Sequence, residues 1–139
     1  MKPEDAPVSA DEYVLRLIHP IYYKADLTLP IQPEAFRPLD VGEAGLSVFR
    51  AECLHEPLDA LAAIAEGKRS LYYIARLAIA DLRTLGLSVQ PDNILTVPGH
   101  AIIPELNTVA YHQNKVFWKQ VQRQLAEMAS RNVVHRPQT

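Results

Sequence analysis

The chain has 139 residues, of which 48% are hydrophobic and 22% charged, and its formal net charge is −2. This length and balance predict one globular domain with one apolar core and exclude a disordered or fibrous chain. The small net charge disfavours nucleic acid as a partner, and no apolar run approaches the roughly 20 residues that span a bilayer, which argues against a membrane role.

Cysteine and histidine usage bears on compartment and cofactor content. Cys53 is the single cysteine and cannot form an internal disulfide, and the first seven residues lack the apolar centre of a signal peptide. We therefore expect a cytoplasmic protein. The five histidines and Cys53 show no paired ligand spacing, and no glycine-rich phosphate or dinucleotide loop is present. We expect neither a metal nor another cofactor.

The start of the chain predicts an unstructured segment followed by a strand. Prolines and acidic residues near the N-terminus cannot propagate regular structure, so residues 1–12 are expected to form a flexible arm. Residues 13–18, Tyr-Val-Leu-Arg-Leu-Ile, are dense in apolar and β-branched side chains. That composition predicts a strand covered on both faces, because only the arginine interrupts the apolar run.

A long proline-rich segment separates this strand from the next. Residues 20–45 contain four prolines and predict an extended, ordered loop with a turn from Gly42 to Gly45. Loops of this length in compact domains usually carry function, so we expect the segment to frame any binding surface. Residues 46–52 then resume the alternation of a second strand.

The middle of the chain predicts short elements of both kinds. A proline followed by apolar residues at helical spacing predicts an amphipathic helix over residues 56–66. Aromatic and β-branched residues predict a strand over residues 71–77, and the next run predicts a helix over residues 79–85 that ends at a glycine. Two further strands are expected at residues 87–90 and 100–103.

The longest predicted element is a C-terminal helix. Asn107 is a favourable N-cap, and no glycine or proline follows until beyond residue 130, while apolar side chains recur at helical spacing. We therefore predict an α+β fold, with a small mixed or antiparallel sheet and the helix over residues 108–130 packed on it beside a shorter helix. The globular domain is expected over residues 13–131, and residues 132–139 are expected to form a flexible tail.

A histidine and a glutamate flank the predicted strand at residues 100–103. The turn Pro98-Gly99 delivers His100 to the start of the strand, and Glu105 follows its end. In a cleft, His100 could act as a general base with Glu105 as a proton acceptor or orienting group. The alternative favoured by the sequence is structural, with His100 bonded to local backbone and Glu105 solvated near a helix start.

Arginine and aromatic residues supply candidate contact residues. Five arginines could gather over a pocket and clamp a phosphate or carboxylate through bidentate hydrogen bonds, although pairing on the surface is the simpler expectation: Arg16, Arg37, Arg50, Arg69 and Arg76. Of these we take Arg37 and Arg50 as candidate contacts. Phe117 and Trp118 are adjacent and point about 100° apart on a helix, so both are hard to bury together. We take Trp118 as a candidate partner contact.

Four segments together are similar to a group of short, uncharacterised bacterial proteins. The longest is Pro98-Gly99-His100-Ala101-Ile102-Ile103-Pro104-Glu105-Leu106-Asn107, and the others lie at residues 35–36, 45–48 and 81–89. The resemblance spans most of residues 13–130. It implies a bacterial origin and a compact domain, and it carries no activity or catalytic residue.

Two functional interpretations follow from the sequence. The favoured one is a small intracellular accessory protein that binds a protein partner, which includes a second copy of itself. The alternative is a small enzyme, a hydrolase or transferase acting on a nucleotide-like or peptide substrate through His100 and Glu105. The two interpretations differ on whether His100 reaches a cleft with a titratable nitrogen available.

Overall fold

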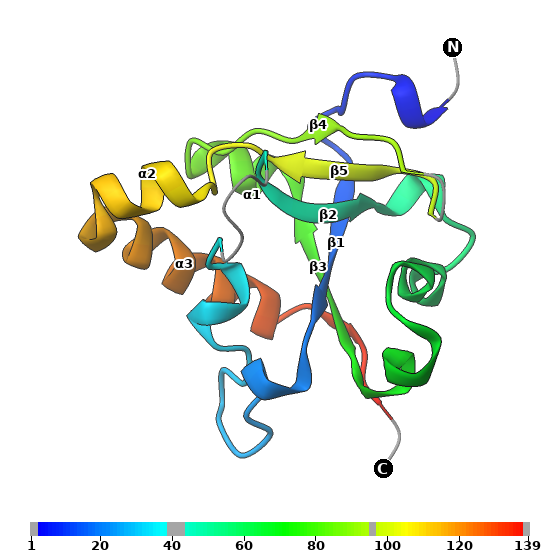
Figure 1. Ribbon diagram of the computed structural model, residues 1–139, viewed down its shortest axis with the longest axis horizontal. Coiled ribbons are helices and arrows are strands. Elements are labelled where there is room, and N and C mark those ends of the chain that lie inside the picture. The colour runs from blue at the N-terminus through cyan, green and yellow to red at the C-terminus, as the bar shows by residue number, and fades with distance from the viewer. Residues whose placement is uncertain (1–2, 39–43, 95–96, 138–139) are drawn as a thin grey trace.

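The computed structural model describes residues 3–38, 44–94 and 97–137 of the chain. Within these ranges six strands form one antiparallel sheet in the order β4-β5-β2-β1-β3-β6 (Figure 1). The strands are β1 (Tyr13–Ile18), β2 (Leu46–Arg50), β3 (Tyr73–Ala78), β4 (Gln90–Pro91), β5 (His100–Ile103) and β6 (Val133–His135). The predicted α+β fold is confirmed.

Three α-helices and several 3₁₀ helices connect the strands of the described chain. The α-helices are α1 (Ile79–Thr84), α2 (Thr108–Gln113) and α3 (Lys115–Ser130). The 3₁₀ helices are η1 (Pro3–Asp5), η2 (Pro20–Tyr22), η3 (Pro33–Phe36), η4 (Ala51–Cys53), η5 (Pro57–Ala63) and η6 (Glu66–Leu71). Short 3₁₀ turns are suited to segments rich in proline, which supplies the fixed φ of a first turn.

Each face of the sheet carries its own apolar cluster. Helix α3 covers one face, where Val121 and Leu125 pack in the larger cluster with Val14 of β1. Successive strand residues point to opposite faces, so Leu15 joins the smaller cluster on the other side, together with Leu61 of η5. Figure 1 shows α3 and the green η5 region on opposite sides of the strands.

The predicted long helix is divided into two. Asn107 caps α2 as expected, with its side chain accepting a hydrogen bond from the Ala110 backbone N–H. The helix then breaks at Asn114, which has φ −152° and ψ 71° and whose side chain accepts from the Phe117 N–H. The break has a local cause, because an asparagine side chain competes with the helix for backbone donors and favours caps.

The predicted helix over residues 56–66 is shorter and differently wound. It is the 3₁₀ helix η5, and it covers the face of the sheet opposite α3. Only the neighbouring residues Ala60 and Leu61 are buried, while Leu58 and Ala62 are exposed. The apolar spacing that predicted an α-helix is therefore not used for packing, and burial of two adjacent residues imposes no 3.6-residue period.

The two chain ends differ from the expectation of loose segments. Residues 133–135, expected in a flexible tail, form strand β6 against β3 at the edge of the sheet. The N-terminal arm is attached to β2 through the side chain of Arg50 and to α1 through a hydrogen bond from Arg83 Nη2 to the Val8 carbonyl. Nonlocal pairing of this kind leaves no trace in local sequence composition.

Smaller differences concern the loops. The strand expected at residues 87–90 forms only at Gln90–Pro91, while Leu87 is buried in the larger cluster. The turn expected from Gly42 to Gly45 lies in part outside the described residues. Across residues 3–38, 44–94 and 97–137, none of the helices combines the length and hydropathy needed to cross a membrane.

Candidate functional site

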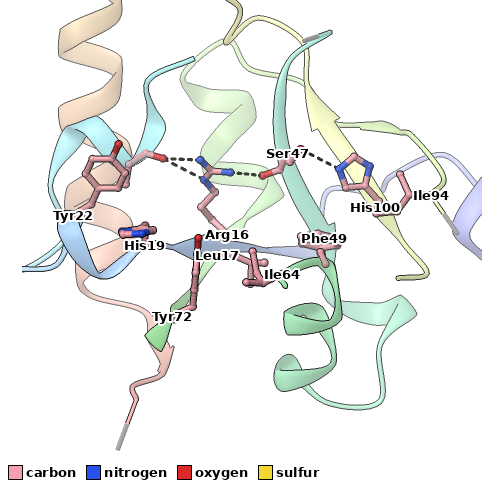
Figure 2. Close-up of a pocket in the computed structure, with 12 residues that line it drawn as sticks. Arg16, Leu17, His19, Tyr22, Ser47, Phe49, Ile64, Tyr72, Ile94 and His100 are labelled. Carbon is pink, nitrogen blue, oxygen red and sulfur yellow. Dashed lines mark hydrogen bonds between the residues drawn. The ribbon is translucent and has the colours of Figure 1, made fainter. Parts of the chain in front are cut away.

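A cavity of about 380 Å³ opens on the sheet face that carries the smaller apolar cluster (Figure 2). Its walls come from three strands, from the loop after β1 and from the segments around η3 and η5. The described lining residues are Arg16, Leu17, His19, Tyr22, Ala35, Ser47, Phe49, Ala63, Ile64, Tyr72, Ile94 and His100. Tyr22 and Ala35, from the loop at residues 20–45 that is expected to frame any binding surface, line this cavity.

The cavity lies where β1 and β2 separate. These strands are paired only at Val14 with Arg50 and at Leu15 with Phe49. Beyond that point Arg16 spans the gap, because Nη1 donates to the Ser47 carbonyl at 2.9 Å and Nε and Nη2 donate to the Ala35 carbonyl at 3.2 and 2.8 Å. The guanidinium is thus held in a fixed position beside Ser47 (Figure 2).

His100 contributes an imidazole whose tautomer follows from its hydrogen bonds. Nδ1 lies 2.6 Å from the Asp92 carbonyl oxygen, which can only accept, so Nδ1 carries a proton. The Asp92 carboxylate adds a second oxygen 3.3 Å from Nδ1. In neutral His100 the lone pair is therefore on Nε2, which lies 3.1 Å from Ser47 Oγ. The Ser47 hydroxyl donates to Nε2 in that state, as Figure 2 allows the reader to follow.

The register of the sheet brings Ser47 and His100 together. His100 pairs with Phe49 across β2 and β5, and Ser47 is two residues from Phe49 on the same face. The two side chains are diagonal neighbours, which is within reach of an imidazole and a hydroxyl. The ring of His100 packs edge-on against Phe49 with centroids 5.3 Å apart, and the histidine is only 7% exposed.

The cavity has one wall that carries the Arg16 guanidinium and one that is apolar. Among its described lining residues are one arginine and two histidines but no aspartate or glutamate. The remaining surface is largely aromatic or aliphatic, from Tyr22, Tyr72 and Ile64 among others. A small organic anion with an apolar portion matches this combination, because the guanidinium attracts negative charge and the apolar wall excludes water.

Glu105, proposed with His100 as a catalytic pair, lies elsewhere. Its two carboxylate oxygens accept hydrogen bonds from Ser88, one from the backbone N–H at 2.8 Å and one from the hydroxyl at 2.6 Å. It is not among the residues that line the cavity. The structure therefore does not bring Glu105 into the cavity with His100, because the chain turns after β5 and carries Glu105 to the loop beyond α1.

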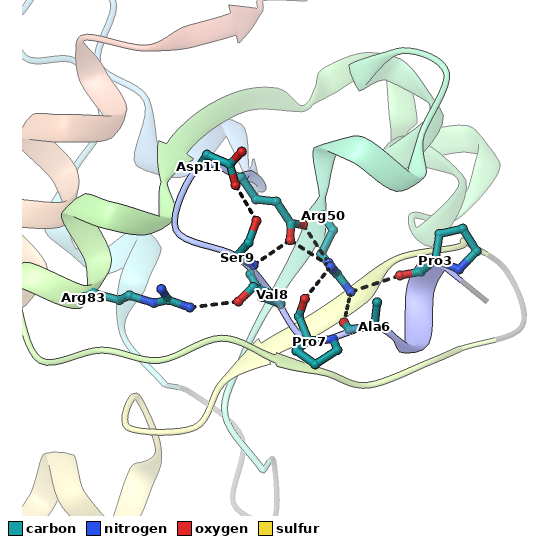
Figure 3. A network of polar contacts seen from close by, with 9 residues as sticks. Pro3, Ala6, Pro7, Val8, Ser9, Asp11, Arg50 and Arg83 are labelled. Atoms are coloured by element: carbon teal, nitrogen blue, oxygen red, sulfur yellow. Dashed lines mark hydrogen bonds and ion pairs between the residues drawn. The ribbon is translucent and has the colours of Figure 1, made fainter. Parts of the chain in front are cut away.

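Arg50, proposed as a ligand contact, is buried in the protein. Its Nε and Nη2 donate to the two Glu12 carboxylate oxygens at 2.9 Å each, and Nη1 donates to the carbonyls of Pro3 and Ala6 (Figure 3). Burial raises the pKa of Glu12, but the hydrogen bonds from Arg50 and the Ser9 backbone outweigh it and hold that pKa below its ordinary value. The side chain is 3% exposed and serves the fold.

The other candidate contacts are placed separately. Arg37 is exposed and lines a different cavity, with its guanidinium 5.0 Å from the centroid of the Tyr111 ring. Trp118 is half-buried against the larger apolar cluster, while Phe117 beside it is 48% exposed. Phe117 rather than Trp118 is therefore the side chain more available to a partner.

Sequence reasoning missed Ser47 and Asp92. Ser47 is a single hydroxyl in the otherwise apolar run Leu46-Ser47-Val48-Phe49, which is a weak signal because strands often carry one polar residue on a half-covered face. Asp92 sits in the turn after β4 and contacts His100 because its own N–H bonds to the His100 carbonyl at 2.9 Å. Only the strand register relates these positions to His100.

The described residues hold no group of three or more His, Cys, Asp or Glu side chains placed to bind a metal ion. Comparisons of the chain with protein-family models, curated proteins and solved structures found no match. The resemblance of residues 98–107 to bacterial proteins stays a prediction.

Proposed function

We propose that this chain is a small hydrolase that cleaves, in the His100 cavity, an ester that also carries a free anionic group. Ser47 acts as nucleophile and His100 as general base. The observation that carries the proposal is the hydrogen-bonded row from Ser47 Oγ through the His100 ring to Asp92 at the wall of that cavity. A hydroxyl beside a neutral, oriented imidazole is the arrangement that activates a serine.

The chemistry has two stages. Ser47 Oγ attacks the ester carbonyl carbon while its proton passes to His100 Nε2, and that proton then leaves with the alcohol as the ester C–O bond breaks. A water molecule next attacks the acyl-serine, giving its proton to Nε2, and the carboxylic acid departs as Ser47 recovers its proton. The Asp92 carbonyl and carboxylate hold Nδ1–H and stabilise the transient imidazolium.

The substrate class follows from the walls. The positive charge of Arg16 is fixed beside Ser47, where it favours a substrate carboxylate and stabilises negative charge that develops on the attacked carbonyl oxygen. Tyr72, Ile64 and Ile94 offer apolar contact for the remainder of the substrate. A volume of about 380 Å³ suits a small molecule rather than a folded chain.

Labelling with a fluorophosphonate probe tests the nucleophile. We expect a single adduct on Ser47, located by mass spectrometry of the digested protein, and no adduct in Ser47→Ala. His100→Gln should slow labelling about a hundredfold or more, because the proton acceptor is lost. Ser70→Ala and His112→Gln are matched controls with exposed side chains outside the cavity, and they should label at the parent rate.

Hydrolysis of nitrophenyl esters tests the substrate class. A half-ester of succinic acid should be cleaved faster than the uncharged acetate ester, and Arg16→Met should abolish that preference. Labelling of other serines, or an unchanged labelling rate in a folded His100→Gln, would contradict the proposal. The second result would identify His100 as a structural residue whose ring only satisfies the Asp92 carbonyl and the Ser47 hydroxyl.

A second candidate function is self-association, in line with the protein partner expected from the sequence. It is favoured by apolar side chains exposed at the starts of α2 and α3, where Val109 is 67%, Val116 76% and Phe117 48% exposed. Such a patch can pair with the same patch of a second copy about a twofold axis. In sedimentation equilibrium we expect a dimer that Val116→Asp dissociates and Val134→Asp, on β6, does not. A monomer at all concentrations would exclude it.

A further inference from the structure

Another cavity, of about 360 Å³, shares none of its lining residues with the His100 cavity. It is formed where Arg37 and the residues of η3 meet α2 and α3. The residues that line it are Pro33, Glu34, Arg37, Tyr111, Lys119, Gln122 and Arg123. We propose that this cavity binds the phosphate group of a small phosphate monoester.

The charges of the lining residues favour an anion. Arg37 follows η3 and is exposed. Lys119 and Arg123 are also exposed, and they lie four residues apart on one face of α3. Glu34 is the single carboxylate among the described lining residues, so these three cations outnumber it. Within the chain that the structure describes, none of the three has an ion pair. Charge gathered in a concave site without neutralising partners suits a phosphate dianion.

Gln122 gives a second, independent observation that favours a ligand in this cavity. Its side chain is 3% exposed and lines the cavity between the two cations of α3 in sequence, yet its amide Nε2 has no hydrogen-bond partner among the described residues. An unpartnered buried donor lowers stability, and a leucine would fill the same position without that penalty. A phosphate oxygen in the cavity supplies the acceptor that the amide lacks.

Arg37 is prepared for this role by its packing. Its guanidinium lies 5.0 Å from the centroid of the Tyr111 ring, and Tyr111 is itself 3% exposed and fixed in α2. Contact with an aromatic face restricts the guanidinium while leaving its edge able to donate paired hydrogen bonds. The Lys119 ammonium and the Arg123 guanidinium line the same cavity from α3.

The small size of the positive region favours a small ligand over a polyanion. The chain as a whole carries a formal net charge of −2, so no extended positive field attracts nucleic acid. A cavity of about 360 Å³ has room for a phosphate and a short organic group. Inorganic phosphate shares the same chemistry, and the experiment separates the two sources.

The test is titration of the full chain, uniformly labelled with ¹⁵N, with glycerol 3-phosphate, inorganic phosphate and glycerol. We expect glycerol 3-phosphate at millimolar concentrations to shift the Gln122 side-chain amide and the Arg37 Nε–H signals in NMR spectra, and glycerol to shift neither. Lys119→Ala and Arg123→Ala should each weaken binding about tenfold, as loss of a charge-assisted hydrogen bond does. Lys115→Ala removes an exposed α3 cation outside the cavity and should bind like the parent chain.

Gln122→Leu separates a binding role from a structural one. If Gln122 serves the ligand, the variant melts at a higher temperature because the unpartnered amide is gone, and it binds glycerol 3-phosphate more weakly. If the parent chain binds inorganic phosphate as tightly as glycerol 3-phosphate, the site is supported and the free anion is identified as its ligand. Absence of shifts with both phosphates, or shifts that persist in Lys119→Ala and Arg123→Ala, would overturn the proposal.

Discussion

Arg50 and Arg37 are equivalent candidates in the sequence, and the structure gives them opposite surroundings. Arg50 is 3% exposed, and its guanidinium donates to the Glu12 carboxylate and to backbone carbonyls of the N-terminal arm (Figure 3). Arg37 is exposed in a cavity beside two other cations. The guanidinium of Arg50 has its acceptors within the protein. The guanidinium of Arg37 lines a cavity where an external acceptor can bind.

The difference shows how the same side chain acquires either a structural or a binding role. A buried guanidinium has to find acceptors within the protein, because an uncompensated buried charge is costly. An exposed guanidinium is solvated and remains available to an external anion at little cost. The hydrogen-bonded guanidinium of Arg50 therefore holds the N-terminal arm in place. The neighbouring cations around Arg37, which have no ion pair among the described residues, form a place where a ligand can bind.

Replacing each of the two arginines by methionine should give the largest difference in the free energy of unfolding. Arg50→Met leaves the Glu12 carboxylate buried without its partner, and we expect a loss of about 3–5 kcal/mol in the free energy of unfolding. Arg37→Met removes an exposed side chain and should change that free energy by less than about 0.5 kcal/mol. Urea denaturation of both variants measures the difference. Equal losses would show that the contrast drawn between the two arginines is wrong.

A glycine substitution tests the close packing beside the Arg50 backbone. Gly99 has a φ of 83°, and a Cβ at this position would lie 2.5 Å from the Cys53 Cβ. We expect Gly99→Ala to cost about 1–3 kcal/mol, because neither the contact nor the left-handed backbone tolerates a side chain. Gly67→Ala is the matched control, since nothing lies within 4 Å of a Cβ there. A melting temperature unchanged in both variants would indicate that the segment before His100 adapts easily.

The acid dependence of stability should depend on Glu12 and gives the smallest effect. The folded-state pKa of Glu12 lies below its ordinary value, so its contribution is present above the ordinary pKa of about 4.3 and is lost as the pH falls through the folded-state pKa. The stability difference between the parent chain and Glu12→Gln should therefore shrink as the pH is lowered from 7 into this acid range. Urea midpoints at several pH values measure it, with exposed Glu66→Gln as control. A difference independent of pH would argue against the ion pair.

Local sequence patterns determined much of the fold. Alternation and β-branched residues located the strands at residues 13–18 and 100–103, and Asn107 marked the start of the C-terminal helices. These features depend on neighbours within one turn or one strand, which is the range over which periodicity and capping act. The break at Asn114 and the 3₁₀ winding of η5 escaped the same patterns, because a short side chain-to-backbone bond and a two-residue contact decided them.

The sequence also determined which residue types were available for chemistry, since it singled out His100, Arg37 and the loop at residues 20–45. Only the tertiary structure decided how they combine. Strand register placed Ser47 beside His100, the turn after β5 carried Glu105 away to Ser88, and the fold of the arm enclosed Arg50. These contacts join positions far apart in the chain, so their geometry depends on pairing and packing of the whole sheet, which no local pattern of residues records.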